Sequence, residues 1–482
     1  MKTSDLTRLL GDRPFWKQTL ALGIPVALQN LLSASFSMVD TVMVSQLGGD
    51  GLSAVGMAGQ WSWFFVTLLF GFTSGAAVLQ SQYWGARNET GIRRVATVAL
   101  LGSLLCLLPF FLLSLFAPRL VISFFNSDPA ILDIGGRYLR IALWSYPALA
   151  MNGVLAATLR SVGQVKLPMV ASLLSAALNV LCNYCLIFGA GPIPALGIEG
   201  AAIATVISAW FGPVLLLLVS ILRKNVLCGS LRSYFGLSRG EVTGAMRRIL
   251  PVVGNEVLYG LAALVLTMIL SNLGKDEYGG VTIFNSVSNL VLSFYQGICS
   301  ACCITVGTQV GAGRIREAVR DAKRFSLIAP MLSLFLGMGI LLFRGPIVLL
   351  FGGDGGLSEV TVATAHAILL FYGLEIALRN IPNLQIIGIL RAGGNVSAAA
   401  LFDLVCLWGL VIPVALLTSY LGLPLFAVFV ITYLCEDVSK TVLCLIFFFK
   451  EKWLMPVTEE GRAALAAYRA EGQSAKTQGK NA

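Results

Sequence analysis

Long apolar segments without charges recur along the whole chain of 482 residues, separated by short polar stretches. Residues 98–117, VALLGSLLCLLPFFLLSLFA, form one uncharged segment of this kind. About 20 such residues cross the roughly 30 Å hydrocarbon core of a bilayer as a helix. The segments are too long and too continuous to be the roughly 10-residue strands of a membrane barrel. The pattern therefore predicts an all-α polytopic membrane protein.

Twelve transmembrane helices are predicted from these segments. Helices are favoured because each one satisfies its own backbone hydrogen bonds, as lipid requires. The expected spans are residues 17–44, 54–84, 92–116, 134–160, 166–188, 196–222, 244–272, 280–311, 317–344, 361–390, 394–419 and 422–450.

The chain aligns with itself at an offset of 226 residues, which drifts to 231 near the end. Matching pairs include IPV 24–26 with LPV 250–252, SQLG 45–48 with SNLG 271–274, Gly71 with Gly297, and GA 85–86 with GA 311–312. Each half holds six spans, so both halves enter the membrane from the same side. This predicts two six-helix lobes related by a pseudo-twofold axis along the membrane normal. Such lobes suit alternating access, although a duplication could also simply enlarge a bundle.

The predicted organisation follows from this repeat. It comprises an N-terminal lobe (1–222), a basic cytoplasmic linker (223–243), a C-terminal lobe (244–450) and a cytoplasmic tail (451–482). We expect the linker to lie on the surface or to be loosely ordered, and the tail to form a short Ala-rich helix.

Composition and charge support a lipid environment. The chain is 57% hydrophobic and 12% charged, with a mean hydropathy of +0.82, whereas a soluble domain has about 25% charged residues. With both termini inside, the cytoplasmic segments hold 27 of the 34 Lys and Arg residues and the outer loops hold five. This is the positive-inside distribution. It explains the net charge of +10 without a nucleic acid partner and predicts a multi-pass plasma-membrane protein with both termini cytoplasmic.

Asp40 places a carboxylate inside an apolar span. An acid near the membrane centre costs about 2.5–3.5 kcal/mol on insertion scales, so it needs partners or a function. Asn179 and Asn183, one helical turn apart, are expected at the same depth in span five. A carboxylate with two carboxamides could bind Na⁺ or form a hydrogen-bonded proton site. The alternative is a polar network that only joins helices.

The second half carries a different set of polar residues, since Leu266 occupies the position equivalent to Asp40. Glu256 is expected near mid-depth in span seven, where Asn380 and Arg379 of span ten could reach it, so a Na⁺ site at Asp40 or at Glu256 is possible. Glu375 has the i, i+4 spacing of an ion pair with Arg379, although Arg379 could equally pair with Glu256. The other charged residues within spans are Asp403, Glu436, Asp437 and Lys440, of which Glu436 and Lys440 are again i, i+4.

Two prolines occupy matching early positions in the first span of each half. Pro25 and Pro251 each remove a helix hydrogen bond, which predicts either a hinge or a static kink. Candidate cavity-lining residues, for which core packing is an equal alternative, are Gln29, Asn30, Met38 and Tyr295.

Motifs for enzymatic chemistry are missing from the sequence. There is no GxxxxGK[ST] phosphate loop, no histidine-rich cluster, and the single histidine cannot form a relay alone. The ten cysteines fall mostly within spans and indicate small apolar packing residues rather than disulfides. We therefore expect no enzyme activity and no cofactor besides a coupling ion, with an ion gradient as the energy source.

The chain resembles the MATE (multidrug and toxic compound extrusion) family over about residues 15–450. The resemblance rests on IPVALQNLLSASFSMVDTVMVSQLG, LRSVGQVKLPM, LNVLCNY, LGIEGAAIATVIS, LPVVGNE and ILRAGGN. It implies two lobes around a V-shaped cavity and export of cationic drugs in exchange for H⁺ or Na⁺. It also implies an ion-responsive Asp40 beside Asn179 and Asn183, and a second-lobe role for Glu256, as in NorM-like members. Asn380 replaces an aspartate of some NorM-like members, and Asn183 replaces one of some DinF-like members, so the coupling ion stays open.

The expected protein is a monomeric secondary exporter of cationic or amphiphilic small molecules in contact with membrane lipid. One alternative is a flippase for lipid-linked precursors, which the scarcity of basic residues within spans disfavours, since only Arg379 and Lys440 qualify. Another is a membrane receptor or enzyme that does not transport.

Overall fold

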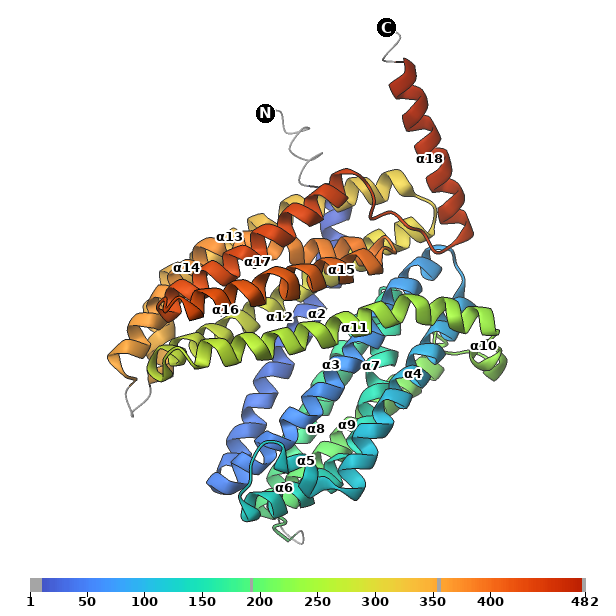
Figure 1. Ribbon diagram of the computed structural model, residues 1–482. Coiled ribbons are helices and arrows are strands. Elements are labelled where there is room, and N and C mark those ends of the chain that lie inside the picture. Colours follow the sequence, from blue (N-terminus) through green and yellow to red (C-terminus); the bar gives the residue numbers. More distant parts are fainter. Residues whose placement is uncertain (1–10, 191–193, 353–356, 479–482) are drawn as a thin grey trace. The chain divides into compact units, whose positions relative to one another are not determined.

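The computed structural model describes residues 11–190, 194–352 and 357–478, which are almost entirely helical (Figure 1). The helices are α2 (Arg13–Ser45), α3 (Gly49–Gly85), α4 (Glu89–Phe116), α5 (Pro118–Ser123), α6 (Pro129–Ala142), α7 (Ser145–Ser161), α8 (Lys166–Phe188), α9 (Ile198–Arg223), α10 (Leu231–Phe235), α11 (Arg239–Ser271), α12 (Lys275–Gly311), α13 (Ile315–Gly352), α14 (Glu359–Asn383), α15 (Val396–Cys406), α16 (Ile412–Tyr420), α17 (Leu425–Phe449) and α18 (Glu459–Gln478). Two π-helical segments, η1 (Leu384–Leu390) and η2 (Leu407–Val411), continue α14 into the next loop and join α15 to α16.

Most of the predicted spans are single helices. In the described part of the chain, ten helices or joined helices are long and apolar enough to cross a membrane, and an eleventh is the pair α6 and α7, bent by 48°. The bend lies just before Pro147, which has no N–H to continue the helical hydrogen bonds. The twelfth predicted span corresponds to α17, a helix of 25 residues. It differs from the others because it carries Glu436, Asp437 and Lys440.

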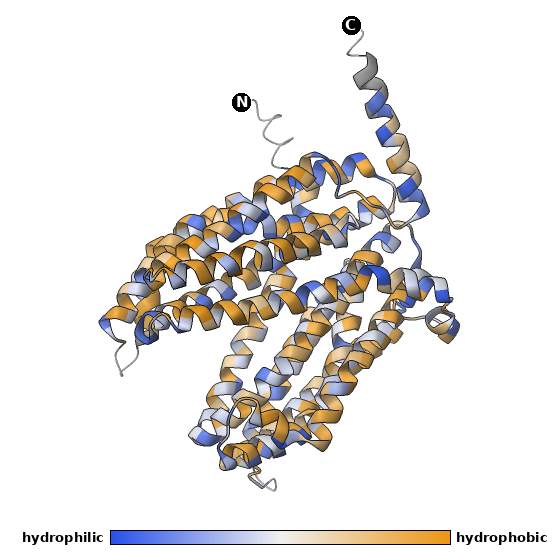
Figure 2. Cartoon of the chain, in the orientation of Figure 1, coloured by the Kyte–Doolittle hydropathy of each residue, from blue (hydrophilic) through white to orange (hydrophobic). Residues whose placement is uncertain are grey.

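Large apolar side chains cover the outside of these helices. Phe335, Leu349 and Leu350 are 75%, 78% and 83% exposed. In Figure 2 the apolar residues follow most of the length of the long helices, whereas hydrophilic residues gather at helix ends and along α18. Water would not tolerate so much exposed apolar surface, whereas lipid would. The chain is therefore a multi-pass membrane protein, as the hydrophobic pattern predicted.

The structure divides into two compact units built from separate stretches of chain. Unit 1 comprises Met1–Ala27, Ser81–Arg87 and Val257–Ala482, and unit 2 comprises Leu28–Gln80 and Asn88–Glu256. Helices α2, α3 and α11 thus each pass from one unit into the other. This division differs from the contiguous lobes 1–222 and 244–450, which stay a prediction.

The 226-residue repeat reappears in the packing inside each unit. In unit 2, a Cβ on Gly71 of α3 would lie 2.6 Å from Val253 Cα of α11. In unit 1, a Cβ on Gly297 of α12 would lie 2.9 Å from Ala27 Cβ of α2. Both members of one pair differ from those of the other by 226 residues. Equivalent helices therefore make equivalent close contacts, and each unit includes the first part of a helix from the other half of the sequence.

The GA dipeptides of the repeat mark a helix crossing within unit 1. A Cβ on Gly85 of α3 would lie 2.0 Å from the Thr308 carbonyl oxygen, and one on Gly311 of α12 would lie 2.0 Å from the Gln82 carbonyl oxygen. The contacts are reciprocal, since 82 and 308 are also 226 apart. Only glycine permits two helix backbones to approach so closely.

Replacing Gly311 by Ala is expected to destabilise the protein. The methyl group has to displace the α3 backbone, and overpacking of this kind costs about 1–3 kcal/mol. Thermal unfolding of the purified protein in detergent checks this. The matched control is Gly59→Ala, also within α3, where a Cβ meets nothing within 4 Å. Equal melting temperatures for the two variants would show that the crossing is not tight.

The linker between the halves is held by specific contacts rather than being loosely ordered. Arg93 of α4 donates from Nε to the Val226 carbonyl at 2.8 Å and from Nη2 to the Cys228 carbonyl at 3.1 Å. Ser238 and Glu241 form a reciprocal cap at the start of α11, in which Glu241 Oε2 accepts from the Ser238 N–H at 2.8 Å. That backbone N–H is the main cause that lowers the pKa of the Glu241 carboxyl. The cap fixes where α11 begins.

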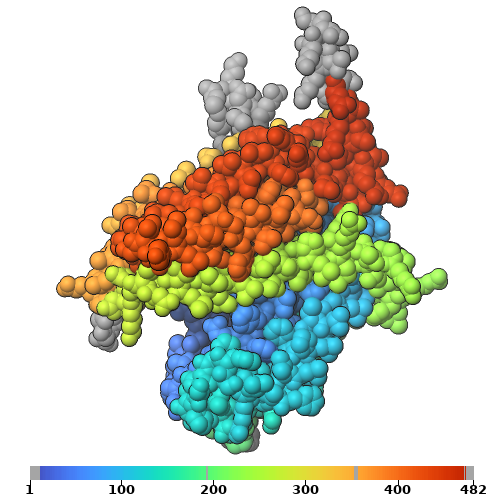
Figure 3. Space-filling model, in the orientation of Figure 1, coloured from blue at the N-terminus to red at the C-terminus, as the bar shows by residue number. Residues whose placement is uncertain are grey.

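The core of unit 1 is rich in aromatic side chains. The Phe284 ring of α12 meets Tyr372 of α14 and Phe429 of α17 edge-on, with centroids 4.9 Å and 5.0 Å apart. Figure 3 shows side chains of α16 and α17, in orange and red, closing the visible face of this unit. The segment after α17 also packs tightly, because Trp453 is only 1% exposed and the Met455 N–H donates to the Gly393 carbonyl at 2.8 Å. The tail is thus anchored before α18 begins, and α18 is longer than the short helix predicted.

Candidate functional site

Asp40 lies in the second half of α2 and contacts α8 within unit 2. Asn183 Nδ2 donates a hydrogen bond to Asp40 Oδ1 and lies 3.3 Å from Asn179 Oδ1. Asn179 Nδ2 in turn donates to Ser208 Oγ of α9 at 3.2 Å. Asn183 is fully buried, whereas Asp40 is half-buried. The structure therefore brings together the three residues that the sequence grouped by depth.

The surroundings of Asp40 supply amide and hydroxyl groups rather than a base. Among the residues that the structure describes, no ion pair includes Asp40. The buried Asn183 Oδ1 accepts no hydrogen bond from a described residue. An uncompensated carboxylate beside an unused carbonyl oxygen is suited to receiving a proton or a small cation.

Two contributors to this site were missed in the sequence. Ser208 extends the hydrogen-bonded chain, and Tyr138 of α6 lies within electrostatic reach of Asp40. Both lie in apolar stretches where one hydroxyl gives no distinctive signal. Only the packing of α6 and α9 against α8 and α2 identifies them.

The predicted cavity-lining residues fall into different environments. Gln29 and Asn30 are half-buried, and Gln29 Nε2 donates to Ser172 Oγ of α8 at 2.8 Å. Met38 is 71% exposed. Tyr295 is 1% exposed, and its hydroxyl donates to the Asn380 carbonyl at 2.8 Å. For Tyr295 the alternative of core packing is therefore the one observed.

The predicted second-lobe residues do not form one site in either unit. Glu256 is half-buried on α11 as the last residue of unit 2. Asn380 is 1% exposed in unit 1, where its Nδ2 donates to Ser333 Oγ of α13 at 2.9 Å. Its Oδ1 accepts from Asn383 Nδ2 at 3.3 Å. The Asn380 amide thus joins α13 to α14, while an ion-binding role for Glu256 stays a prediction. Pro25 and Pro251 lie inside the continuous helices α2 and α11.

A cluster of charged residues is buried within unit 1. We call it the charged cluster, and its members are Glu375, Arg379, Asp403, Glu436, Asp437 and Lys440. Lys440 Nζ lies 2.8 Å from Asp403 Oδ1 and 2.9 Å from Glu436 Oε1. The predicted i, i+4 pair of Glu436 and Lys440 is therefore confirmed.

The predicted pairing of Arg379 with Glu375 is wrong. Arg379 Nη1 instead faces Asp437 Oδ2 of α17 at 3.7 Å. Spacing of i, i+4 puts two side chains on one face of a helix. It does not say what the neighbouring helix presents to that face, and here α17 presents a carboxylate.

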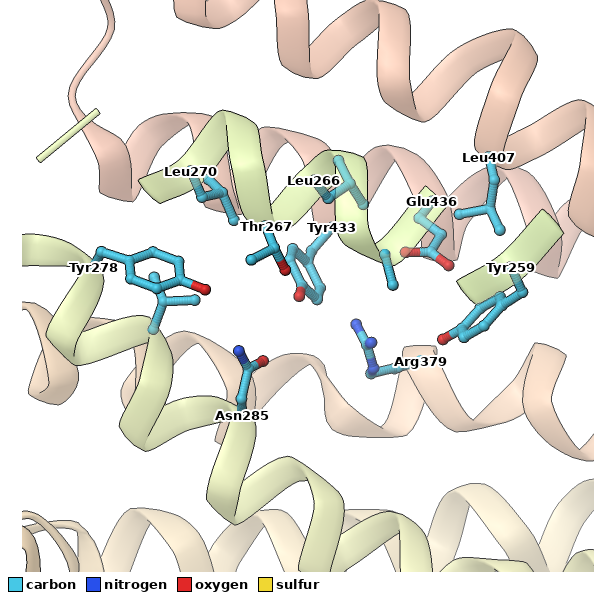
Figure 4. Close-up of a pocket in the computed structure, with 12 residues that line it drawn as sticks. Tyr259, Leu266, Thr267, Leu270, Tyr278, Asn285, Arg379, Leu407, Tyr433 and Glu436 are labelled. Carbon is cyan, nitrogen blue, oxygen red and sulfur yellow. The ribbon is translucent and has the colours of Figure 1, made fainter. Parts of the chain in front are cut away.

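A cavity of about 110 Å³ adjoins the charged cluster (Figure 4). Its lining comes from α11, α12, α14, η2 and α17 and includes Tyr259, Leu266, Asn285, Arg379, Tyr433 and Glu436. The Arg379 guanidinium carbon lies 4.7 Å from the centre of the Tyr433 ring, a cation–π contact. Leu266, the repeat equivalent of Asp40, lies on the wall. The second half therefore lacks an acid on the repeated helix but acquires charges from α14 and α17.

Known proteins resemble this chain over most of its length. The family model MatE matches residues 25–185 and 251–417, one match in each half. A probable multidrug resistance protein NorM of Thermotoga maritima is 25% identical over 461 residues, covering 94% of this chain and 95% of that protein. A protein of the same name from Listeria monocytogenes is 24% identical over 85% of this chain and 89% of its own length.

Solved structures share the fold. A MOP superfamily transporter from Pyrococcus furiosus superposes with a TM-score of 0.79 at 20% identity, covering 97% of this chain and 99% of that one. A eukaryotic MATE transporter, AtDTX14, superposes with a TM-score of 0.78 at 18% identity, covering 94% and 98%. The family model spans well over half of the sequence, and its two matches coincide with the two halves of the repeat. The chain therefore belongs to the MatE family of membrane transporters, which carry small molecules and are not enzymes.

Proposed function

We propose that this protein is a secondary active multidrug exporter that exchanges cationic or amphiphilic drugs for H⁺ or Na⁺ by alternating access. The relatives named as probable multidrug resistance proteins support the substrate class. The observation that carries the coupling is Asp40, a carboxylate in a membrane helix whose contact is the Asn183 amide rather than a base.

The proposed cycle follows from competition for negative charge. A drug cation enters from inside while Asp40 is ionised. After outward opening, an external proton or Na⁺ binds at Asp40 and removes the charge that favoured the drug, which leaves. The occupied site then favours return, and the ion is released inside. An ion can shift the two states only by its different affinity for them, so Asp40 and its amide partners are expected to change contacts between states.

The coupling ion depends on how many oxygens gather at Asp40. The described residues contain no group of three or more His, Cys, Asp and Glu side chains that could hold a metal. Na⁺ would thus have to use the Asp40 carboxylate with amide and hydroxyl oxygens, namely those of Asn179, Asn183 and Ser208. A proton needs only the carboxylate and one hydrogen-bond partner.

The remaining features are proposed from sequence and environment. The distribution of Lys and Arg favours the plasma membrane with both termini in the cytoplasm, and we expect a monomer. Export of anionic lipid-linked precursors is less well supported. Arg379 and Lys440, the two basic residues within spans, each face carboxylates and are not free to bind an anionic headgroup.

Efflux from proteoliposomes tests this function and identifies the ion. Purified protein is reconstituted with a fluorescent cationic dye, and proton and sodium gradients are imposed separately. Dye movement driven by one gradient and abolished by the matching ionophore is expected. No gradient-driven movement of any cationic dye, despite correct insertion, would contradict the proposal. Movement of an anionic lipid analogue alone would favour the flippase.

A further inference from the structure

Glu375 of α14 is a buried carboxylate without a hydrogen-bond donor. It is 6% exposed, and neither of its oxygens accepts a hydrogen bond from a described residue. Its neighbour across the helix interface is Asp437 of α17, 3% exposed and within hydrogen-bonding reach of Glu375. Two carboxylate ions are both acceptors only, so a hydrogen bond between them requires a proton on one.

The charges around this pair do not balance without that proton. Lys440 lies between Asp403 and Glu436, and Arg379 faces Asp437. The charged cluster therefore holds four carboxyls against two bases. An isolated buried carboxylate is strongly disfavoured, and two carboxylates sharing one site do not both ionise readily. The surplus negative charge is greatest at Glu375, which has no basic contact within salt-bridge distance.

A proton suits this place better than a metal ion. None of the described residues form a group of acids, histidines and cysteines fit to hold a metal. The charged and titratable groups around the pair are Tyr372 and Arg379 of α14, Tyr259 of α11, Asp403 of α15, and Tyr433, Glu436 and Lys440 of α17. α12 contributes the Ser288 hydroxyl to Tyr372. These partners include two cations, which would repel a metal ion.

We propose that Glu375 and Asp437 share one exchangeable proton, forming a proton-binding site separate from Asp40, and that this proton controls Arg379. Uptake forms an O–H bond on one carboxyl with a proton from water, and release returns that proton to water. In the present geometry Arg379 makes a long contact with Asp437 and lies against Tyr433 at the cavity wall (Figure 4). Release leaves a doubly charged pair, which draws the guanidinium toward it and away from the cavity. As a coupling site this rests on the proposed export function.

Infrared difference spectroscopy of the purified full-length protein tests the proton without transport. Spectra are recorded during a pH titration of the Asp40→Asn variant, so that Asp40 contributes nothing. A band from a protonated carboxyl that appears reversibly as the pH is lowered, before the exposed acids protonate, is expected. The band should disappear in Glu375→Gln and in Asp437→Asn made in the same background. It should persist in Glu359→Gln, which removes an exposed carboxyl at the start of the same helix.

The outcomes separate this inference from the proposed function. Absence of the band in Asp40→Asn protein, or its persistence in either folded pair variant, overturns the shared proton. In that case gradient-driven efflux by the wild type would leave the exporter function standing. With the band present, Glu375→Gln proteoliposomes are expected to lose most of the pH dependence of the efflux rate. An unchanged pH profile overturns the control of Arg379, and a wild type without efflux would contradict the export function alone.

Discussion

Asp40→Asn is expected to lower ion-driven efflux at least about 100-fold while leaving the protein folded and inserted. A coupling free energy of 1–3 kcal/mol corresponds to about 5–150-fold in affinity, and loss of the ion site removes that coupling. Asparagine has the shape of aspartate and can still hydrogen-bond to Asn183, so the contact between α2 and α8 persists. It cannot take up a proton or balance a cation, so the competition between ion and drug disappears.

Efflux of a cationic dye, measured per inserted molecule in proteoliposomes, checks this expectation. Asp40→Glu keeps the charge and should retain partial activity. Asp50→Asn is the matched control, because it removes an exposed carboxylate at the start of α3 and should leave efflux unchanged. Wild-type efflux by Asp40→Asn would remove this residue from the mechanism.

Lys440→Met is expected to prevent stable folding of unit 1. Lys440 is 5% exposed and neutralises both Asp403 and Glu436. Removing one partner of a buried ion pair costs about 3–5 kcal/mol because the other charge stays buried and unpaired. Net stabilities are about 5–15 kcal/mol, so the loss takes much of the total. We expect little monodisperse protein and a strongly lowered melting temperature.

Removal of the stranded acids should reverse this effect. The triple variant Lys440→Met, Asp403→Asn and Glu436→Gln contains no unpaired charge at this place and should recover most of the melting temperature. Lys450→Met at the exposed end of α17 is the control, with an expected change within about 0.5 kcal/mol. A single variant as stable as the wild type would show that water reaches Lys440 and that the triad is not buried.

Much of the fold was predictable from the sequence because lipid imposes strong constraints. An unbroken apolar run long enough to cross the bilayer must be helical, so the spans followed from hydrophobicity alone. The exception is α17, whose three charged residues weaken the signal. The 226-residue offset predicted a duplication, and the reciprocal contacts of Gly85 and Gly311 show the same offset in three dimensions.

The candidate sites were predictable only in part. Asp40 was conspicuous because a lone acid in an apolar run is costly, and depth along two parallel helices placed Asn183 beside it. Glu436 and Lys440 were paired correctly because one turn of a helix brings them together. Arg379 was assigned the wrong partner, since its helix offers Glu375 but the neighbouring helix offers Asp437.

The sequence by itself therefore determined the membrane class, the helices, the repeat and the importance of Asp40. All of these depend on hydrophobic length, local spacing or the cost of an isolated charge. The tertiary structure decided which segments form each compact unit, which acid meets which base, and which carboxylate has no donor. Those outcomes depend on contacts between residues far apart in the chain. Helix packing selects such contacts from many that the sequence allows.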